Sequence, residues 1–263
     1  MDLGLAGRTV VLTGGTSGIG LATVGLFLEE GARVAFCGRD AHRLDSVASG
    51  FAQRFGVEKV LARRCDVTAK ADVEAFADAI ARWSGSLDIL VNNAGQGQMT
   101  TFATTSDAQW REELELKFFS QIYPVRAFRP LLEKSDAAAI LSVNSLLAYQ
   151  PEPYMVATSA ARAGAQSLVK SLASEFAPKI RVNSVVLGLI DSGQWERRFQ
   201  ARKDQTQDRK TWIADLAASK HIPFGRLGEP LEVARAIVFL CSPMASFITG
   251  ASLEISGGVS RYI

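Results

Sequence analysis

The chain has 263 residues, of which 48% are apolar and 21% charged, and its formal net charge is +2. A chain of this length buries enough surface to fold without disulfides or a structural metal. The near-neutral charge argues against a nucleic-acid partner, because nucleic-acid-binding proteins carry a strongly basic face. No apolar run approaches the ~20 residues of a membrane span, so we expect no membrane partner either.

The first residues and the cysteines indicate the compartment. The start of the chain lacks the basic and apolar regions of a signal peptide. Cys37, Cys65 and Cys241 lie in apolar contexts without CxxC-type spacing. We therefore expect a cytoplasmic protein with reduced cysteines and no metal site.

Short β-rich runs alternate along the chain with longer segments in which apolar residues recur every three or four positions. The predicted elements are strand 8–13, helix 19–30, strand 33–38, helix 41–55, strand 60–65, helix 69–83, strand 87–91, helix 107–133, strand 138–143, helix 154–176, strand 180–186, helix 230–240 and strand 252–255. Nearly continuous apolar strands suit a parallel sheet covered on both faces. The pattern predicts one α/β domain over residues 1–263, with a doubly wound parallel sheet of about seven strands and helices on both faces.

Two segments depart from this rhythm. Pro124 and Pro130 should kink or interrupt the long helix 107–133. Residues 189–223 are too long for an ordinary connection, and insertions of this kind are functional lids or disordered segments.

A glycine-rich turn follows the first predicted strand. The segment TGGTSGIG runs from Thr13 to Gly20 and leads directly into a helix. Glycines allow the tight turn and the close approach of backbone to ligand, and the free N–H groups of the helix suit a pyrophosphate. Because the turn lies between strand and helix, nucleotide binding is favoured over a ligand-free turn. The candidate cofactor-binding residues here are Gly14, Thr16, Ser17, Gly18, Ile19 and Gly20.

The end of the second strand indicates which nucleotide is preferred. A carboxylate there accepts a hydrogen bond from the ribose 2′-hydroxyl of NAD, whereas an arginine suits the 2′-phosphate of NADP. The strand ends in Cys37-Gly38-Arg39 and carries no carboxylate at its tip. Arg39 therefore favours NADP(H) over NAD(H). The alternative is a solvated Arg39 paired with Asp40.

Further motifs occur in a fixed order along the chain. They are CDV at 65–67, NNAG at 92–95, SVNS at 142–145, SLASEFAPKIRVNSV at 171–185 and GRLGEP followed by SGG within 225–258. Together with the glycine-rich turn they resemble the short-chain dehydrogenase/reductase family over essentially the full chain.

That resemblance implies a Rossmann-type domain that binds a nicotinamide cofactor, acts on a small-molecule carbonyl or alcohol, and forms a homodimer or homotetramer. It places Asp66 and Val67 at the adenine ring. It also places Asn93, Ala94 and Gly95 along the cofactor, the alternative being that NNAG only stabilises a strand end.

The catalytic positions of the family hold unusual residues in this chain. The family uses a Tyr as acid and base, a Lys four residues later, a Ser thirteen residues before the Tyr, and an Asn on the preceding long helix. Counted from the SLASE motif, the Tyr position holds Thr158 and the Lys position holds Arg162, whereas Ser145 is retained. Counted from Trp110, the Asn position holds Lys117.

These replacements change the acid–base chemistry. A phenol has a pKa near about 10, whereas an aliphatic hydroxyl lies closer to the ~15.7 of water. We expect Thr158 to donate hydrogen bonds but to be a poor source of protons. Arg162 keeps a positive charge that can hold ribose hydroxyls, but it cannot relay a proton; alternatively it is paired on the helix surface. Lys117 either stabilises negative charge directly or fills the Asn space and pairs with Glu113 or Glu115.

Tyr154 is a candidate for the missing phenol. It lies one turn before Thr158 and shares a stripe with Thr158 and Arg162 if the helix already includes it. Because Pro151 and Pro153 restrict the preceding backbone, Tyr154 could instead lie on a loop as a wall of the pocket.

The stretch after the sixth strand also departs from the family. The usual Pro-Gly pair and Thr are replaced by the sequence LGLIDS at 187–192. Gly188 is retained, and Ser192 could supply the hydroxyl that contacts the cofactor amide. Both are candidate cofactor-binding residues, together with Arg162.

The variable segment carries an excess of positive charge. Between residues 195 and 210 the cations are Arg197, Arg198, Arg202, Lys203, Arg209 and Lys210, and the anions are Glu196, Asp204 and Asp208. By resemblance this region closes over the substrate, so the excess would favour an anionic substrate or the phosphate of an acyl carrier. The alternative is an exposed amphipathic helix pair with Trp195, Phe199 and Trp212 facing inward.

Two functions follow from these residues. The first is an NADP(H)-dependent oxidoreductase with altered proton-transfer residues, in which the cofactor carries the hydride chemistry. The second is a nucleotide-binding protein that has lost catalysis and acts as a sensor or subunit.

Overall fold

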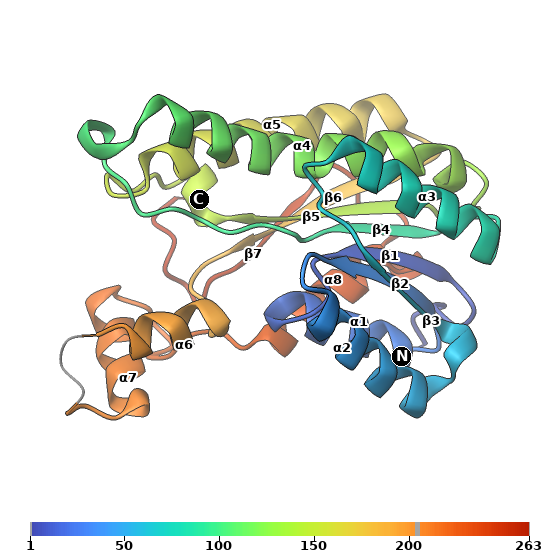
Figure 1. The fold of residues 1–263 in the computed structure, drawn as a ribbon. Helices are drawn as coiled ribbons and strands as arrows, with labels where there is room; N and C mark the ends of the chain where they lie inside the picture. Colours follow the sequence, from blue (N-terminus) through green and yellow to red (C-terminus); the bar gives the residue numbers. More distant parts are fainter. Residues whose placement is uncertain (1, 203–205, 263) are drawn as a thin grey trace.

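In the computed structural model, which describes residues 2–202 and 206–262, the strands form one parallel sheet in the order β3-β2-β1-β4-β5-β6-β7 (Figure 1). The strands are β1 (Thr9–Thr13), β2 (Arg33–Gly38), β3 (Val60–Arg64), β4 (Ile89–Asn92), β5 (Ala139–Ser145), β6 (Arg181–Leu187) and β7 (Ser252–Ile255). The chain order reverses between β1 and β4. In such sheets ligands bind beyond the carboxyl ends of the strands at the reversal.

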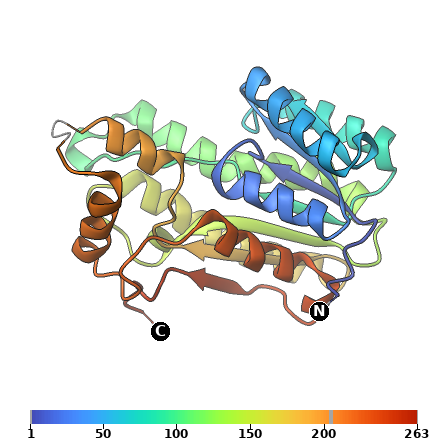
Figure 2. The same ribbon diagram turned by 90° about the horizontal axis from the view of Figure 1, so that it is seen from below.

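Two layers of helices cover the sheet (Figures 1 and 2). One face carries α1 (Gly18–Glu29), α2 (Ala41–Phe55) and α8 (Pro230–Cys241), and the other carries α3 (Lys70–Ser84), α4 (Asp107–Leu132) and α5 (Val156–Phe176). Each face has its own apolar core, with Phe27 and Phe36 in one and Phe76 and Phe128 in the other. The predicted α/β fold of the Rossmann type is confirmed.

Short 3-10 turns and two further helices complete the chain. The turns are η1 (Val57–Lys59), η2 (Phe102–Thr104), η3 (Leu146–Ala148) and η4 (Pro243–Ala245). Between β6 and α8 lie α6 (Gly193–Gln200) and α7 (Arg209–Ser219), which project to one side of the sheet (Figure 1). No helix in the described part of the chain combines the length and apolarity needed to cross a bilayer.

The aromatic residues of α6 and α7 pack against one another. The ring centroids of Trp195 and Trp212 are 6.2 Å apart, and those of Phe199 and Trp212 are 5.6 Å apart. Ala217, Ile222 and Leu227 form a small buried cluster beside them. The helix pair with inward-facing aromatics is therefore observed, and Lys203 and Asp204 lie outside the described residues.

The predicted interruption of the long helix is wrong. Helix α4 continues through Pro124 and Pro130. Proline removes one helical hydrogen bond, but packing of an apolar face contributes more to helix stability in proteins than a single bond does. Pro124 and Phe128 are both buried on the face of α4 that meets the core, so tertiary packing holds the helix together.

Most predicted boundaries shift by one or two residues, and one shift matters for function. Helix α5 begins at Val156, so Tyr154 lies on the preceding turn rather than on the helix. The condition under which Tyr154 shares a helical stripe with Thr158 is not met.

The core under α3 and α4 offers a test of this packing. Phe128 is fully buried, and its ring meets that of Phe76 edge-on at 5.5 Å. We expect Phe128→Ala to lower the free energy of unfolding by about 3–5 kcal/mol, because it leaves a cavity. Urea denaturation measures the change. Val57→Ala, at a side chain that is 77% exposed, should stay within about 0.5 kcal/mol of the parent protein; equal losses in both would contradict the packing described.

Candidate functional site

The glycine-rich turn joins β1 to α1 in a shape that only glycine allows. Gly14 has a φ of +74° and Gly18 a φ of +53°, both in the left-handed region. A Cβ on Gly20 would lie 2.1 Å from the carbonyl oxygen of Gly14. Ser17 precedes the helix in an extended conformation and makes no side-chain cap. The first N–H groups of α1, which have no partner within a helix, are therefore available to an anionic ligand.

Hydrogen bonds from the NNAG segment hold the end of β4 against this turn. The Asn93 Nδ2 donates to the carbonyl oxygens of Thr13 and Gly14, both at 3.0 Å. The Thr13 Oγ1 accepts from the backbone N–H groups of Asn93 at 3.0 Å and of Ala94 at 3.1 Å. Asn93 thus has a structural role, and the cofactor contacts of Ala94 and Gly95 stay a prediction.

Arg39 is exposed at the end of β2, next to the turn. Asp40 does not pair with it; Asp40 instead caps α2 by accepting from the Arg43 N–H at 3.1 Å. In sheet register Gly38 lies opposite Arg64, whose Nε donates to the Arg39 carbonyl oxygen at 3.2 Å. The Arg64 guanidinium therefore lies against the backbone of Arg39. Arg64 was not predicted from the sequence, because only the β2–β3 pairing brings it there.

Asp66 lies at the end of β3 and is held as an anion. Burial opposes its ionisation, but hydrogen bonds from the Thr68 N–H at 3.0 Å and the Thr68 hydroxyl at 2.7 Å favour it. With the added charges of Arg39 and Arg64, the pKa of Asp66 stays below its ordinary value. The neighbouring Val67 is buried.

A buried charged cluster forms where α4 and α5 face each other below the loop that follows β4. The Thr158 hydroxyl donates to Glu113 Oε2 at 2.5 Å, and Lys117 Nζ donates to the same oxygen at 3.1 Å. Lys117 Nζ also donates to the carbonyl oxygen of Gln96 at 2.5 Å. Glu113, Lys117 and Thr158 are all at most 4% exposed. Lys117 therefore pairs with Glu113, and Glu115 is exposed.

Thr158 is held by both of its hydrogen-bonding functions. Its hydrogen goes to Glu113, and its oxygen accepts from the backbone N–H of Gln98 at 3.2 Å. Thr158 therefore donates a hydrogen bond, as expected, and in this arrangement the acceptor is Glu113. The buried carboxylate takes the hydrogen because it is the stronger acceptor.

Arg162 is half-buried and bonds to β5 rather than pairing on the helix surface, so the surface alternative is wrong. Its Nη1 donates to Asn144 Oδ1 at 3.3 Å, and its Nε is buried without a partner among the described residues. Burial lowers its pKa to about 10, against the attraction of Glu113. Burial, followed by repulsion from Arg162, likewise lowers the pKa of Lys117 to about 8, although Glu113 opposes this.

Ser145 lies at the end of β5, beside this cluster. Its Oγ accepts from the Leu147 N–H at 3.3 Å, and the side chain is half-buried. Among the hydrogen bonds of the described residues, none joins Ser145 to Thr158 or Arg162. Its hydroxyl hydrogen is therefore available to a ligand.

Tyr154 contacts the residue that follows α7. That residue is Lys220, which donates its ammonium hydrogen to the Tyr154 hydroxyl and whose Nζ lies 4.9 Å from the ring centroid. Lys220 could not be predicted from spacing, because the two residues are 66 positions apart and come from separate segments. The role of Tyr154 as a wall of the pocket stays a prediction.

Two candidate cofactor-binding residues follow β6, and one of them borders the glycine-rich turn. A Cβ on Gly188 would approach the Ser256 Cα to 2.9 Å, so glycine is required by packing. Ser192 begins α6, and its Cβ would lie 3.7 Å from a Cβ built on Gly18. The start of α6 therefore borders the glycine-rich turn.

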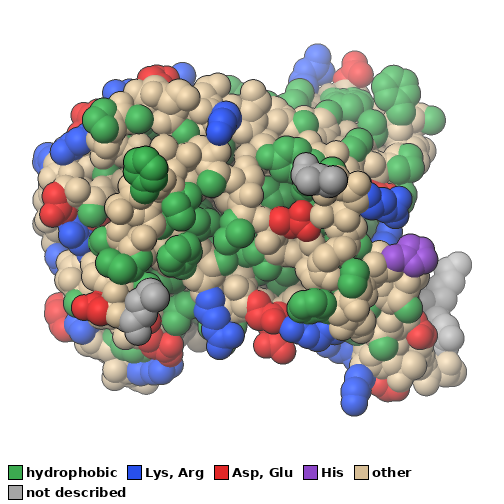
Figure 3. All heavy atoms as spheres, turned by 180° about the vertical axis from the view of Figure 1, so that it is seen from behind, with side chains coloured by type: hydrophobic (Ala, Val, Ile, Leu, Met, Phe, Trp, Pro, Cys, Tyr) green, Lys and Arg blue, Asp and Glu red, His purple; other side chains and the backbone are tan. Residues whose placement is uncertain are grey.

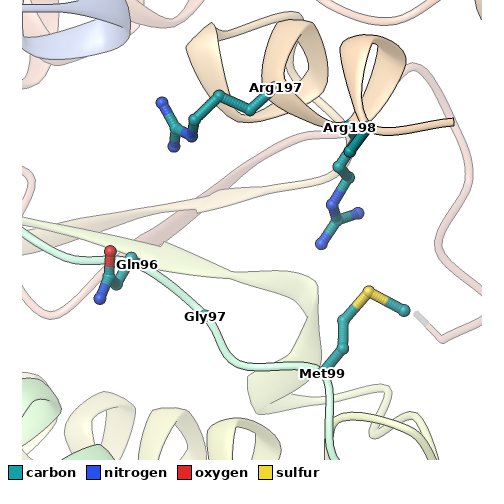
Figure 4. A pocket seen from close by; sticks show the side chains of 6 residues that line it. Gln96, Gly97, Met99, Arg197 and Arg198 are labelled. Carbon is teal, nitrogen blue, oxygen red and sulfur yellow. The ribbon is translucent and has the colours of Figure 1, made fainter.

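A hollow of about 320 Å³ lies between α6 and the loop after β4 (Figure 4). Its lining residues are Gln96, Gly97, Met99, Arg197, Arg198 and Ala201. A Cβ on Gly97 would lie 3.5 Å from the Thr158 side chain, so the hollow borders the buried cluster. In the described part of the chain, no group of three or more His, Cys, Asp or Glu side chains could hold a metal ion.

Comparison with known proteins identifies the family. The sequence model described as enoyl-(acyl carrier protein) reductase matches residues 14–260. The 7alpha-hydroxysteroid dehydrogenase of Escherichia coli K12 is 32% identical over 258 residues, covering 98% of this chain and 96% of its own. The chain belongs to the short-chain dehydrogenase/reductase family. It is an oxidoreductase of that type, and its relatives act on small molecules.

Two solved structures of the family match nearly the whole chain. An NADPH-bound short-chain oxidoreductase from Pseudomonas aeruginosa PAO1, described as containing an atypical catalytic center, is 56% identical with a TM-score of 0.93, covering 97% of this chain and 98% of its own. L-Sorbose reductase from Gluconobacter frateurii, complexed with NADPH and L-sorbose, is 33% identical with a TM-score of 0.95, covering 100% of both chains.

The residues of this chain fit a nicotinamide nucleotide. The turn around Gly20 leaves no room for a side chain, as close approach of a pyrophosphate requires. Among the described residues, the buried Nε of Arg162 has no hydrogen-bond partner. Buried donors normally have one, so this Nε is suited to bind an oxygen of the cofactor.

The lowered pKa of Lys117 predicts how the free energy of unfolding depends on pH. In the unfolded chain the pKa returns to the ordinary value near about 10.4, so between pH 8 and that value the unfolded state binds more protons than the folded state. Stability therefore rises with pH across this window through Lys117. We expect the difference in unfolding free energy between the parent protein and Lys117→Met to increase over the same window. Urea denaturation at stepped pH measures it, and parallel curves would contradict the burial of a titrating ammonium.

Proposed function

We propose that this protein is an NADP(H)-dependent oxidoreductase that interconverts a carbonyl and an alcohol group of a small molecule, with proton-transfer residues unlike those usual in its family. The observation that carries the proposal is the hydrogen-bonded chain from Lys117 Nζ through Glu113 Oε2 to Thr158 Oγ1, with distances of 3.1 and 2.5 Å. It links a buried ammonium to the position at which the family holds its acid.

The nucleotide is held by residues at the carboxyl ends of the first strands. The pyrophosphate would lie at the N-terminus of α1, where the glycine-rich turn leaves N–H groups available. Arg39 and Arg64 would bind the 2′-phosphate, and this supports a preference for NADP(H) over NAD(H). The residues assigned to the cofactor are Gly14, Thr16, Ser17, Gly18, Ile19, Gly20, Arg39, Asp66, Val67, Asn93, Ala94, Gly95, Arg162, Gly188 and Ser192. The NADPH-bound relatives support this assignment.

When bound, the nicotinamide exchanges a hydride with the substrate carbon. In the reductive direction the substrate oxygen then needs a proton, and Thr158 alone is too weak an acid to supply it. Thr158 instead passes a proton on. Lys117 Nζ first gives a proton to Glu113 Oε2, which leaves a neutral amine and a neutral carboxyl group. The Thr158 hydroxyl then turns from Glu113 to the substrate oxygen and gives it its hydrogen, while Oγ1 takes the proton from Glu113 Oε2, which becomes a carboxylate again. With a pKa of about 8, Lys117 is a donor close to neutral working pH.

Two further residues act on the same oxygen and on the cofactor. Ser145 has a hydroxyl hydrogen available, which would hydrogen-bond the substrate oxygen as negative charge develops. Arg162 would hold a ribose hydroxyl through its unpartnered Nε. Its fixed charge also stabilises the Glu113 carboxylate. Tyr154 serves as a wall of the substrate pocket, with residues 189–223 closing over it.

The Pseudomonas aeruginosa oxidoreductase supports an altered centre in an NADPH-binding member of the family, since it is described as having an atypical catalytic center. That relative is 56% identical over nearly the full chain. It therefore supports the view that a protein with an altered catalytic centre can still bind the cofactor. We also propose that the protein is cytoplasmic.

A second candidate is a nucleotide-binding sensor or subunit without catalysis. The observation that favours it is the commitment of the Thr158 hydrogen to Glu113. A protein of this second kind would bind NADPH but would not oxidise it, whichever carbonyl compound is added. An oxidoreductase of the first kind would oxidise NADPH in the presence of at least one carbonyl compound.

We also propose that the chain forms a homodimer or homotetramer, as is usual in the family. Apolar side chains gather over the middle of the face opposite that of Figure 1 (Figure 3). Strand β7 is at the edge of the sheet, with Leu253 exposed, and Phe224 and Phe247 are more than 70% exposed. Patches of this kind mark interaction surfaces.

Arg39 provides the test of the cofactor preference. We expect Arg39→Ser to weaken NADPH binding about tenfold to a hundredfold, because a charge-assisted hydrogen bond is worth about 1.5–3 kcal/mol. NADH binding should change little. Fluorescence titration with each nucleotide measures both affinities, and Arg43→Ser, at a neighbouring exposed arginine, is the control. Equal losses for NADPH and NADH would contradict a 2′-phosphate contact.

The proton chain is tested by kinetics on the best carbonyl substrate found by following NADPH oxidation with a panel of ketones and aldehydes. We expect the reduction rate to fall as pH rises through about 8, where Lys117 loses its proton. Lys117→Met and Glu113→Gln should each lower kcat by about 10²-fold or more and flatten this limb. Glu115→Gln, at an exposed carboxylate of the same helix, is the matched control.

Unchanged kcat in Lys117→Met would show that protons reach the substrate by another route. Tight NADPH binding without oxidation on any carbonyl would favour the second candidate function.

A further inference from the structure

The cations of α6 and α7 have unequal roles in the structure. Arg209 donates to Asp191 at 2.5 Å and to Glu196 at 2.7 Å. Arg202 lies 4.0 Å over the ring of Phe199 and donates to the carbonyl oxygen of Gln207 at 3.0 Å. Both arginines therefore hold the helix pair together, and their charges are used within it.

Arg197 and Arg198 are different, because both line the hollow beside the buried cluster. Figure 4 shows the Arg198 side chain extending from α6 toward the loop that carries Met99. Among the described residues, neither arginine forms an ion pair with a carboxylate. The guanidinium of Arg198 lies 4.6 Å over the ring of Trp195, so its plane is oriented by the helix that carries it.

The surroundings of Arg198 favour an anionic partner. The side chain is half-buried, and this burial lowers its pKa. A cation taken partly out of water without a counter-ion is destabilising unless an anion joins it. The guanidinium group of Arg198 offers donors in the fork geometry that a carboxylate accepts, and Arg197 adds a second positive charge to the same hollow.

The hollow limits the size of the ligand and its distance from the reacting oxygen. At about 320 Å³, it holds roughly ten waters, each of which occupies about 30 Å³ in the liquid. A molecule of about that many heavy atoms fits within it. The opposite wall, at Gly97, lies against Thr158, so one short molecule can reach from the arginines to the proton chain.

We propose that Arg197 and Arg198 bind the carboxylate of the substrate, and that the substrates are small oxo acids and the corresponding hydroxy acids. This inference rests on the proposed function for the reaction itself, and it adds the substrate class and the residues that select it. The oxo group would lie toward Thr158 and the carboxylate toward α6.

The test measures binding rather than turnover. The full-length protein is saturated with NADP⁺, which has no hydride to give, and oxo acids of different chain lengths are titrated by calorimetry beside their methyl esters. We expect at least one acid to bind about tenfold more tightly than its ester, because the ester lacks the charge. Arg198→Met should reduce that preference to about twofold or less, and Arg198→Lys should keep part of it.

Controls separate recognition from folding. Lys210→Met removes an exposed cation of the same segment and should leave the preference unchanged. Arg197→Met is a second test of the site and is titrated with the same acids and esters as Arg198→Met. NADPH affinity and the midpoint of thermal unfolding show that each variant is folded.

Three results would overturn the inference. They are equal binding of every acid and its ester, an equal loss of preference in Lys210→Met and Arg198→Met, and tighter binding of alkyl phosphates than of oxo acids. Failure of the proposed reaction leaves the acid-over-ester preference in place. Failure of this inference leaves the reduction of neutral ketones in place, so the two are distinguishable.

Discussion

The site depends on one buried oxygen, Glu113 Oε2, which accepts hydrogen bonds from both Thr158 and Lys117. A carboxylate that is 2% exposed requires charge compensation. Lys117 supplies it directly and Arg162 supplies it at longer range. Lys117, Thr158 and Arg162 therefore form one electrostatic unit around this carboxylate. Restoring only a tyrosine at 158 would disturb the hydrogen bonding of the carboxylate, and restoring only an asparagine at 117 would remove its ion pair.

Most of the fold could be predicted from the sequence, because apolar runs and helical periodicity are local properties. β2, α2 and β7 have the boundaries that the pattern indicates. The pattern failed where tertiary packing overrides local preference. Helix α4 continues through Pro124 because its buried face packs on the core. For Tyr154 the loop alternative holds, since α5 starts at Val156, after Pro151 and Pro153 restrict the backbone.

The site was predictable to the extent that it follows from spacing. Counting from SLASE singled out Thr158, which lies in the cluster, and Arg162, whose charge interacts with Glu113 from outside it. Glu113 was named only as a partner for Lys117, although its spacing of four residues places both on one face of α4. Choosing Glu113 over Glu115 requires knowing which face of α4 is buried. Arg64 could not be found from spacing at all, because sheet pairing alone places it there.

The loop after β4 connects the cluster to the hollow. On its inner side the Gln96 carbonyl accepts from Lys117, and the Gln98 N–H donates to Thr158. On its outer side Gln96 and Met99 line the hollow below Arg198. An anion bound at the arginines would therefore contact the same short segment that orients the ammonium and the hydroxyl. In the functions proposed for these residues, substrate recognition and proton supply would share one structural support next to the cofactor site.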